Sequence, residues 1–188
     1  VADGAPAAAV PVARPEDPVV VTGARLTPLF GVRPGRVAAF RREAGAWVPI
    51  PVQVDERAMI DFGSAPAANS GTGRFGTVYG TGAVGEAVLQ YTDPATFVGP
   101  DPNPRVDGND EVVLMARDAG EQAVGVDPPD HVNGATGVEL TITDPLRPGA
   151  RSWAYLFAHD GTLDPSAGQR LVDYDFSLDS GGYRATYR

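Results

Sequence analysis

Glycine and proline occur so often in this chain that helices should be scarce. The 188 residues include 23 Gly and 18 Pro, and both residue types destabilise a helix interior. No window repeats apolar residues at the i, i+3, i+4 and i+7 spacing of an amphipathic helix. Short apolar runs alternate instead with turn residues, which favours an antiparallel sheet. We therefore predict an all-β fold, an antiparallel β-sandwich of the Ig-like or jelly-roll-like kind.

The expected strands are short runs rich in β-branched and aromatic residues. They cover residues 19–21, 36–42, 47–54, 86–92, 111–117, 122–126, 137–143, 152–158, 171–178 and 183–188. The second and third runs flank a short Gly-containing loop and predict a hairpin. Pro49 and Pro51 cannot donate ladder hydrogen bonds, so their strand should lie at a sheet edge or beside a bulge. Trp153 and Phe157 share one face of an aromatic run, which predicts a central strand with both residues in the core.

Three segments describe the expected organisation. Residues 1–18 are rich in Ala and Pro and form an extended N-terminal tail or linker. Residues 19–188 form a single β-sandwich domain, since a chain of this length can bury one ample core. A Gly-rich excursion at 63–85 interrupts that domain.

Charge and composition exclude several classes of function. The chain carries 24 acidic residues against 15 basic ones, all of them Arg, for a net charge of −9. It would repel phosphate, so nucleic acid is not an expected partner. No apolar run reaches the length of a transmembrane segment. The absence of Cys excludes disulfides, thiol catalysis and iron–sulfur clusters, and we expect no haem.

The tail bears on the cellular compartment. Residues 1–18 lack the positive and long apolar regions of a signal peptide. They resemble the start of a mature exported protein after cleavage, and a trimmed interdomain linker is the alternative. We therefore expect a secreted, periplasmic or cell-surface protein.

A dense set of oxygen-bearing side chains lies between two predicted strands. Ca²⁺ takes six to eight oxygen ligands from Asp, Asn, Glu and backbone carbonyls. The spacing is not that of an EF-hand, and a turn capped by its own side chains is the alternative. The candidate calcium ligands are Asp101, Asn103, Asp107, Asn109, Asp110 and Glu111.

Two other motifs are weaker indications of a functional site. Residues 71–76 and 80–85 match G-x-G-x-x-G, but no βαβ unit surrounds them, so we expect no nucleotide. His131 and His159 each stand beside an Asp, but no serine elbow accompanies them. We predict no catalytic residues and assign no enzymatic activity.

Aromatic side chains are the remaining candidates for ligand contact. Exposed rings can stack on sugars, although most of these lie in strand patterns and are more simply explained as core. The candidates are Trp47, Tyr79, Phe97, Trp153, Tyr174, Tyr183 and Tyr187.

Two stretches resemble a loosely defined set of uncharacterised exported bacterial proteins. Residues 47–57 contain PVQVDER and residues 109–120 contain DEVVLMARDAG, which is similar to the pattern "PVQVDER … DE(L/V)…ARDAG". The resemblance implies a β-rich envelope or secreted module and no reaction.

These inferences predict a non-catalytic exported binding or structural module, which calcium would stabilise. The alternative is a carbohydrate-binding accessory domain or a fragment of a larger polysaccharide-acting enzyme. The partner would be another protein subunit or a polysaccharide. The tail or the last strand could pair with another chain in a homo- or hetero-oligomer, because an unpaired edge exposes backbone polar groups.

Overall fold

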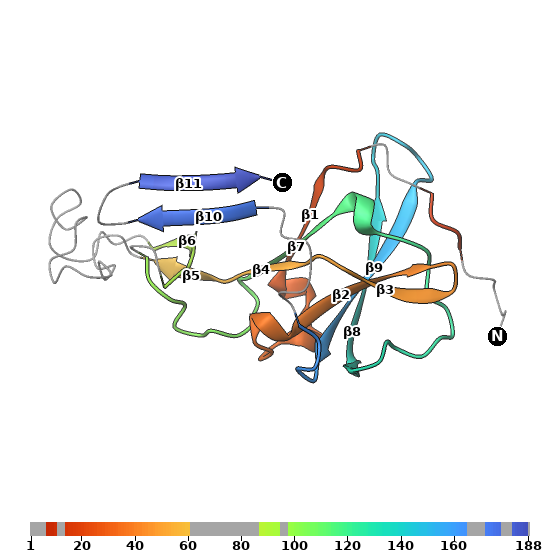
Figure 1. The fold of residues 1–188 in the computed structure, drawn as a ribbon, viewed down its shortest axis with the longest axis horizontal. Coiled ribbons are helices and arrows are strands. Elements are labelled where there is room, and N and C mark those ends of the chain that lie inside the picture. The colour runs from red at the N-terminus through yellow and green to blue at the C-terminus, as the bar shows by residue number, and fades with distance from the viewer. Residues whose placement is uncertain are drawn as a thin grey trace, which may run out of the picture. The chain divides into compact units, whose positions relative to one another are not determined.

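The chain divides into two compact units of antiparallel strands. The computed structural model describes residues 7–10, 14–60, 87–94 and 98–164, together with the backbone of 172–177 and 182–187. The first unit comprises Val1–Val54 and Val106–Gly168, and the second comprises Asp55–Arg105 and Gln169–Arg188. Figure 1 shows the strands of both units, and every paired strand in them is antiparallel. The all-β antiparallel prediction is confirmed.

Two sheets make up the first unit. The larger has the order β3-β2-β9-β8 and the smaller β1-β7-β4. Buried side chains from both sheets form one apolar cluster between them, including Val112 and Leu114 from the smaller sheet and Leu156 from the larger. This arrangement is a sandwich. The strands are β1 (Pro18–Thr22), β2 (Val37–Glu43), β3 (Ala46–Ile50), β4 (Gln53–Asp55), β7 (Glu111–Met115), β8 (Val132–Thr143) and β9 (Arg151–His159).

The predicted hairpin is confirmed as β2 and β3. Glu43 pairs with Ala46, so the loop has two residues, Ala44 and Gly45. Both have positive φ angles, 49° and 78°, as a type I′ turn requires. Glycine adopts this conformation without steric cost, and it holds the strands in the observed register.

The predicted strand that contains Pro49 and Pro51 lies at the edges of the two sheets, as expected. β3 is an edge strand of the larger sheet and β4 an edge strand of the smaller. The Arg42 carbonyl accepts from the Glu121 N–H at 2.9 Å, on the side away from β3. Phe40 lies two residues before Arg42, so its backbone groups also point away from β3. Its partner Pro49 correspondingly points its ring nitrogen away from β2, toward the open edge of the sheet. The chain then turns at Pro51 and Val52 from one sheet into the other, which divides the single predicted strand into two.

β9 is the central strand of the larger sheet. It lies between β2 and β8, and Trp153, Tyr155 and Phe157 are buried on one of its faces. The prediction that Trp153 and Phe157 belong to the core is therefore confirmed. In β8, the predicted alternation is also found, since Ile142 is buried while the flanking threonines are exposed.

The segment after β7 was predicted as a strand at 122–126, and this prediction is wrong. Only Gly120 and Glu121 form isolated bridges, to Trp153 and Arg42. The Ala123 N–H donates to the Tyr155 hydroxyl at 2.7 Å, which removes it from any ladder. Gly125 then adopts a positive φ of 61°, which an extended strand does not allow.

The second unit contains two antiparallel strand pairs. β5 (Arg57–Ile60) pairs with β6 (Val88–Tyr91), and β10 (Val172–Ser177) pairs with β11 (Gly182–Tyr187). The sequence predicts three of these strands but not β5. The Gly-rich excursion at 63–85 lies outside the described residues.

Four 3₁₀ turns complete the described elements, and none was predicted. They are η1 (Gly23–Arg25), η2 (Thr27–Leu29), η3 (Pro34–Arg36) and η4 (Ala116–Asp118). In the part of the chain that the structure describes, no helix has the length and apolar content needed to cross a membrane.

The described parts of the N-terminal tail lie on the first unit itself. Val10 forms a bridge with Arg151, and the Ala7 carbonyl accepts from the Gln122 N–H at 3.2 Å. Nearer to β1, the Pro15 carbonyl accepts from the Arg117 N–H at 2.9 Å. The Val10–Arg151 bridge extends the larger sheet at the start of β9, and the other two contacts hold the tail to the segment that follows β7.

Candidate functional site

The predicted calcium ligands are divided between the two units. Asp101 and Asn103 belong to the second unit, and the other four candidates to the first. Asp101 Oδ1 accepts from the Asn103 N–H at 2.7 Å, which closes an Asx turn. Among the described residues, no three His, Asp or Glu side chains form a group that could hold a metal ion.

The turn before β7 is built by its own carboxylates. Asp110 is 1% exposed, and its Oδ2 accepts from the Asp107 N–H at 2.7 Å. Asp107 Oδ1 accepts in turn from the Asn109 N–H at 3.0 Å. The turn packs so tightly that a Cβ added to Gly23 would lie 1.8 Å from the Asp107 carbonyl oxygen. Each carboxylate can accept further bonds, so calcium binding stays a prediction alongside this capping role.

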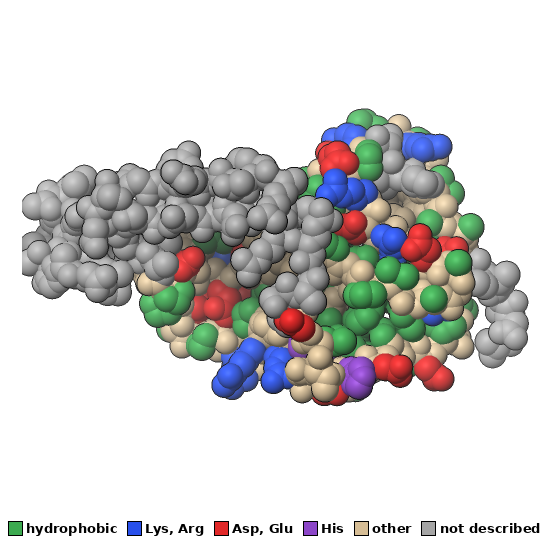
Figure 2. Space-filling view, in the orientation of Figure 1, with side chains coloured by type: hydrophobic (Ala, Val, Ile, Leu, Met, Phe, Trp, Pro, Cys, Tyr) green, Lys and Arg blue, Asp and Glu red, His purple; other side chains and the backbone are tan. Residues whose placement is uncertain are grey.

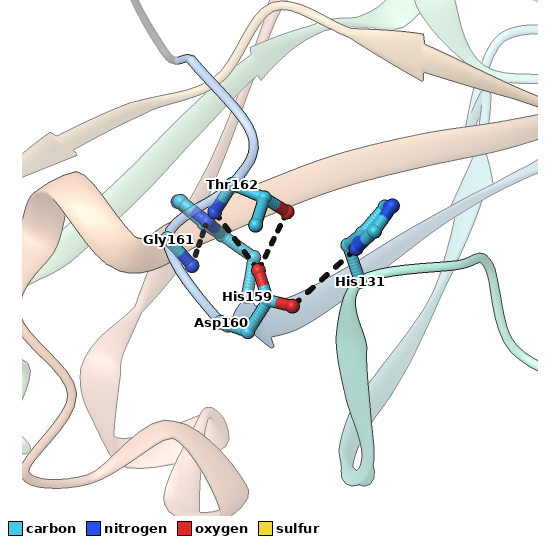
Figure 3. Close-up of polar contacts among 5 residues, drawn as sticks. All are labelled: His131, His159, Asp160, Gly161 and Thr162. Carbon is cyan, nitrogen blue, oxygen red and sulfur yellow. Dashed lines mark hydrogen bonds and ion pairs between the residues drawn. The ribbon is translucent and has the colours of Figure 1, made fainter.

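The two histidines lie near one end of the larger sheet, close to the pairing of Val132 with His159. Figure 2 shows histidine at the surface on the face in view, with acidic side chains beside it. His131 precedes β8 with a positive φ of 65°. Its Nδ1 lies 3.4 Å from Asp160 Oδ2, and both side chains are exposed (Figure 3).

Asp160 is held mainly by Thr162. Asp160 Oδ1 accepts from the Thr162 N–H at 2.9 Å and from its hydroxyl at 2.7 Å. These two donors stabilise the carboxylate and lower the pKa of Asp160 from 3.8 to about 2, with a smaller contribution from His131. The His131–Asp160 pair is thus an ionised carboxylate beside an exposed imidazole.

His159 has a structural role. It is 8% exposed, and its Nδ1 accepts from the Gly161 N–H at 3.1 Å. Its Nε2 lies 3.1 Å from the Gly35 carbonyl oxygen, which can only accept. The hydrogen therefore resides on Nε2, and the neutral ring joins η3 to the end of β9. Figure 3 shows the contact of His159 with Gly161.

The described serine cannot complete a triad with His159. Ser152 and His159 both lie in β9, seven residues apart, and a strand rises about 3.3 Å per residue. Their backbones are therefore separated by about 23 Å. The other serines lie outside the described side chains. In the described residues, the His131–Asp160 pair therefore receives no serine nucleophile from β9.

The tryptophans proposed as sugar platforms are structural. Trp153 is buried, and Trp47 donates its Nε1–H to the Asp127 carbonyl at 2.8 Å. Trp47 also packs edge-to-face on Tyr155, with ring centroids 5.1 Å apart. The side chains of Tyr79, Phe97, Tyr174, Tyr183 and Tyr187 lie outside those that the structure describes.

An exposed apolar face on β5 and β6 was not predicted. Met59 pairs directly with Leu89 and Arg57 with Tyr91, so the four side chains share one face of the antiparallel β5–β6 pair. Met59 is 59% exposed and Tyr91 58%. The Arg57 guanidinium lies 5.9 Å from the centre of the Tyr91 ring. The predicted strand at 86–92 was the available sequence signal. Because β5 was not predicted, its pairing with this strand, and therefore the shared face, could not be foreseen.

No protein-family model, no curated protein and no solved structure matches this chain.

Proposed function

We propose that this chain is a non-catalytic binding or structural module of the bacterial cell envelope or extracellular space. We further propose that its binding surface is the β5–β6 face, defined as Arg57, Met59, Leu89 and Tyr91. The exposed Met59–Leu89 cross-strand pair beside Tyr91 carries this proposal.

The surface has the composition of a contact site. Single exposed apolar residues are common on proteins, but adjacent ones on a single face mark interaction sites more often. Tyr and Met are enriched at interface cores, together with Arg. The cation–π contact of Arg57 with Tyr91 orients a planar donor group beside the apolar pair.

The histidines support a non-catalytic role. His159 directs both ring nitrogens to backbone groups, so neither is available to a substrate. His131 is oriented by a carboxylate, but a nucleophile and an oxyanion site are also needed for the triad chemistry that such a pair serves.

A carbohydrate-binding role is the second candidate, because Tyr91 is an exposed aromatic ring. The apolar face of a sugar can stack on such a ring while Arg57 donates to its hydroxyl groups. Calcium at the 101–111 segment would stabilise either module and is proposed independently of the ligand.

Sedimentation with insoluble probes tests these proposals. The purified chain is mixed with washed bacterial envelope, with cellulose and with chitin, and the bound fraction is measured. We expect Tyr91→Ala and Met59→Ser to reduce binding to envelope, with Leu146→Ala, another exposed apolar residue, as the control. Binding to cellulose or chitin alone would favour the carbohydrate role. Binding that is equal for all variants would refute the β5–β6 face.

A further inference from the structure

We propose that β1 is a self-pairing edge strand, through which two copies of this chain associate antiparallel about Val20. This proposal concerns the first unit alone and does not depend on the ligand proposed above.

The register of β1 shows which backbone groups face outward. β1 pairs with β7 without a bulge, from Pro18 opposite Met115 to Thr22 opposite Glu111. Beyond its ends, the Asp17 carbonyl accepts from Ala116 and the Gly23 N–H donates to Asp110. Odd-numbered residues therefore direct their backbone toward β7. The backbone groups of Pro18, Val20 and Thr22 point to the open edge of the sheet.

This edge is accessible and carries no charge. β1 is an edge strand with the sequence PVVVT, in which Pro18, Val20 and Thr22 are exposed. Val20 is 51% exposed. An uncharged, unbulged edge rich in valine is a template for a further strand.

The other edge strands of the two sheets have features that discourage pairing with a further strand. β3 carries Pro49, whose nitrogen faces outward, and β4 has only three residues. β8 has an irregular register between Asn133 and Val138 and carries Glu139. Bulges, charges, proline and short length all discourage pairing. β1 has a proline only at its first position.

The edge is complementary to itself. In an antiparallel pair centred on Val20, each Val20 N–H donates to the carbonyl of the second copy's Val20. Each Thr22 N–H donates to the carbonyl of the second copy's Pro18. Pro18 has no N–H, so only the Thr22 carbonyl lacks a strand partner. A two-fold axis through Val20 therefore satisfies every outward donor of the strand.

The charges flanking β1 are compatible with this orientation. Glu16 and Asp17 precede the strand and form ion pairs within the chain, with Arg117 and Arg14. Exposed Arg25 follows the strand. Antiparallel pairing places the two Arg25 side chains at opposite ends of the paired strands, whereas a parallel pair would place these like charges together, which is unfavourable.

One strand pair is small. Stable interfaces bury roughly 1,600 Å², and five paired residues contribute only part of that area. We therefore expect a reversible dimer whose population rises with concentration.

Sedimentation velocity over a concentration series tests the proposal. The weight-average mass of the native chain should rise from 19.6 kDa toward twice that value. Val20→Pro removes an outward N–H and no bond to β7, so the fold should survive. We expect it to weaken association by about tenfold or more, because the dimer loses two donors.

Variants of opposite charge at Val20 test whether the partner of β1 is a second copy of the chain. Val20→Glu and Val20→Lys chains should each remain monomeric, because like side chains would face each other across the axis. An equimolar mixture should restore the dimer. Thr141→Lys, on the exposed face of β8, is the control and should dimerise like the native chain. Circular dichroism checks that each variant is folded.

Three results would overturn the proposal. The native chain could remain monomeric at every concentration. The dimer could persist unchanged in folded Val20→Pro chains, or Thr141→Lys alone could abolish it. Monomeric native chains that bind an added valine-rich strand peptide would instead identify β1 as an edge for a different protein.

Discussion

Tyr155 donates its hydroxyl hydrogen to Glu139 Oε2 across the β8–β9 ladder, at an O–O distance of 3.1 Å. The same hydroxyl oxygen accepts from the Ala123 N–H at 2.7 Å. One side chain thus fastens the loop after β7 to the aromatic face of the larger sheet. Burial, and to a lesser degree the neighbouring Glu139, raise the pKa of Tyr155 from 10.0 to about 12.

Tyr155 should make the fold sensitive to alkali. A raised pKa means that the folded protein binds the phenol proton more tightly than the unfolded chain does. This stabilisation is complete below pH 10 and is lost as the pH rises toward 12. Denaturation midpoints measured across this range should fall for the native chain and fall less steeply for Tyr155→Phe. Parallel curves for the two proteins would contradict the prediction.

Asp160 should titrate in acid far from the usual range of an aspartate. Its lowered pKa means that its stabilising effect is present above pH 3.8 and is lost as the pH falls toward 2. Replacing Thr162 with Ala removes the hydroxyl donor but keeps the N–H, so the pKa of Asp160 should rise part of the way to 3.8. Carboxyl ¹³C chemical shifts report this titration. His131→Ala is the control and should change the pKa less, because His131 is a smaller cause.

His159 should matter for stability and His131 should not. Replacing His159 with Phe removes its hydrogen bonds to the Gly35 carbonyl and the Gly161 N–H, at about 0.5–1.5 kcal/mol for each bond, because both glycines are exposed to water. His131→Ala changes an exposed residue and should stay within about 0.5 kcal/mol. Urea denaturation measures both. ¹⁵N shifts of the native ring should show the hydrogen on Nε2, and a hydrogen on Nδ1 would contradict this assignment.

Calcium should stabilise the chain if the 101–111 segment binds it. A ligand that binds only the folded state adds about 2.7 kcal/mol at a hundredfold excess over Kd. The melting temperature should therefore be higher in millimolar Ca²⁺ than in EDTA, and Asp107→Asn should reduce the difference. The matched control is Asp127→Asn, an aspartate outside the segment. Identical melting in both buffers would remove the site.

The fold class could be predicted because it depends on local patterns. The alternation of Val138, Leu140 and Ile142 identifies a strand with one apolar face, and the aromatic run around Tyr155 identifies a central, buried one. The hairpin of β2 and β3 also follows from the short Gly-containing loop between them, although its two-residue turn is known only from the structure. In each case the information lies within about ten residues.

The site features could not be predicted because they depend on distant pairs. His159 is fixed by Gly35, 124 residues away, and no local pattern encodes that contact. The β5–β6 face exists because Met59 meets Leu89, which requires a register that neither strand specifies alone. The failed strand at 122–126 has the same origin, since a tyrosine 32 residues later takes the Ala123 N–H.

The corner at Pro51 and Val52 has a mechanical consequence. One stretch of chain supplies an edge strand to each sheet of the first unit, first as β3 and then as β4. Only Pro51 and Val52 connect β3 to β4, so a force that pulls β3 from β2 is transmitted directly to β4. The two sheets should therefore lose these edges in one cooperative step rather than in succession.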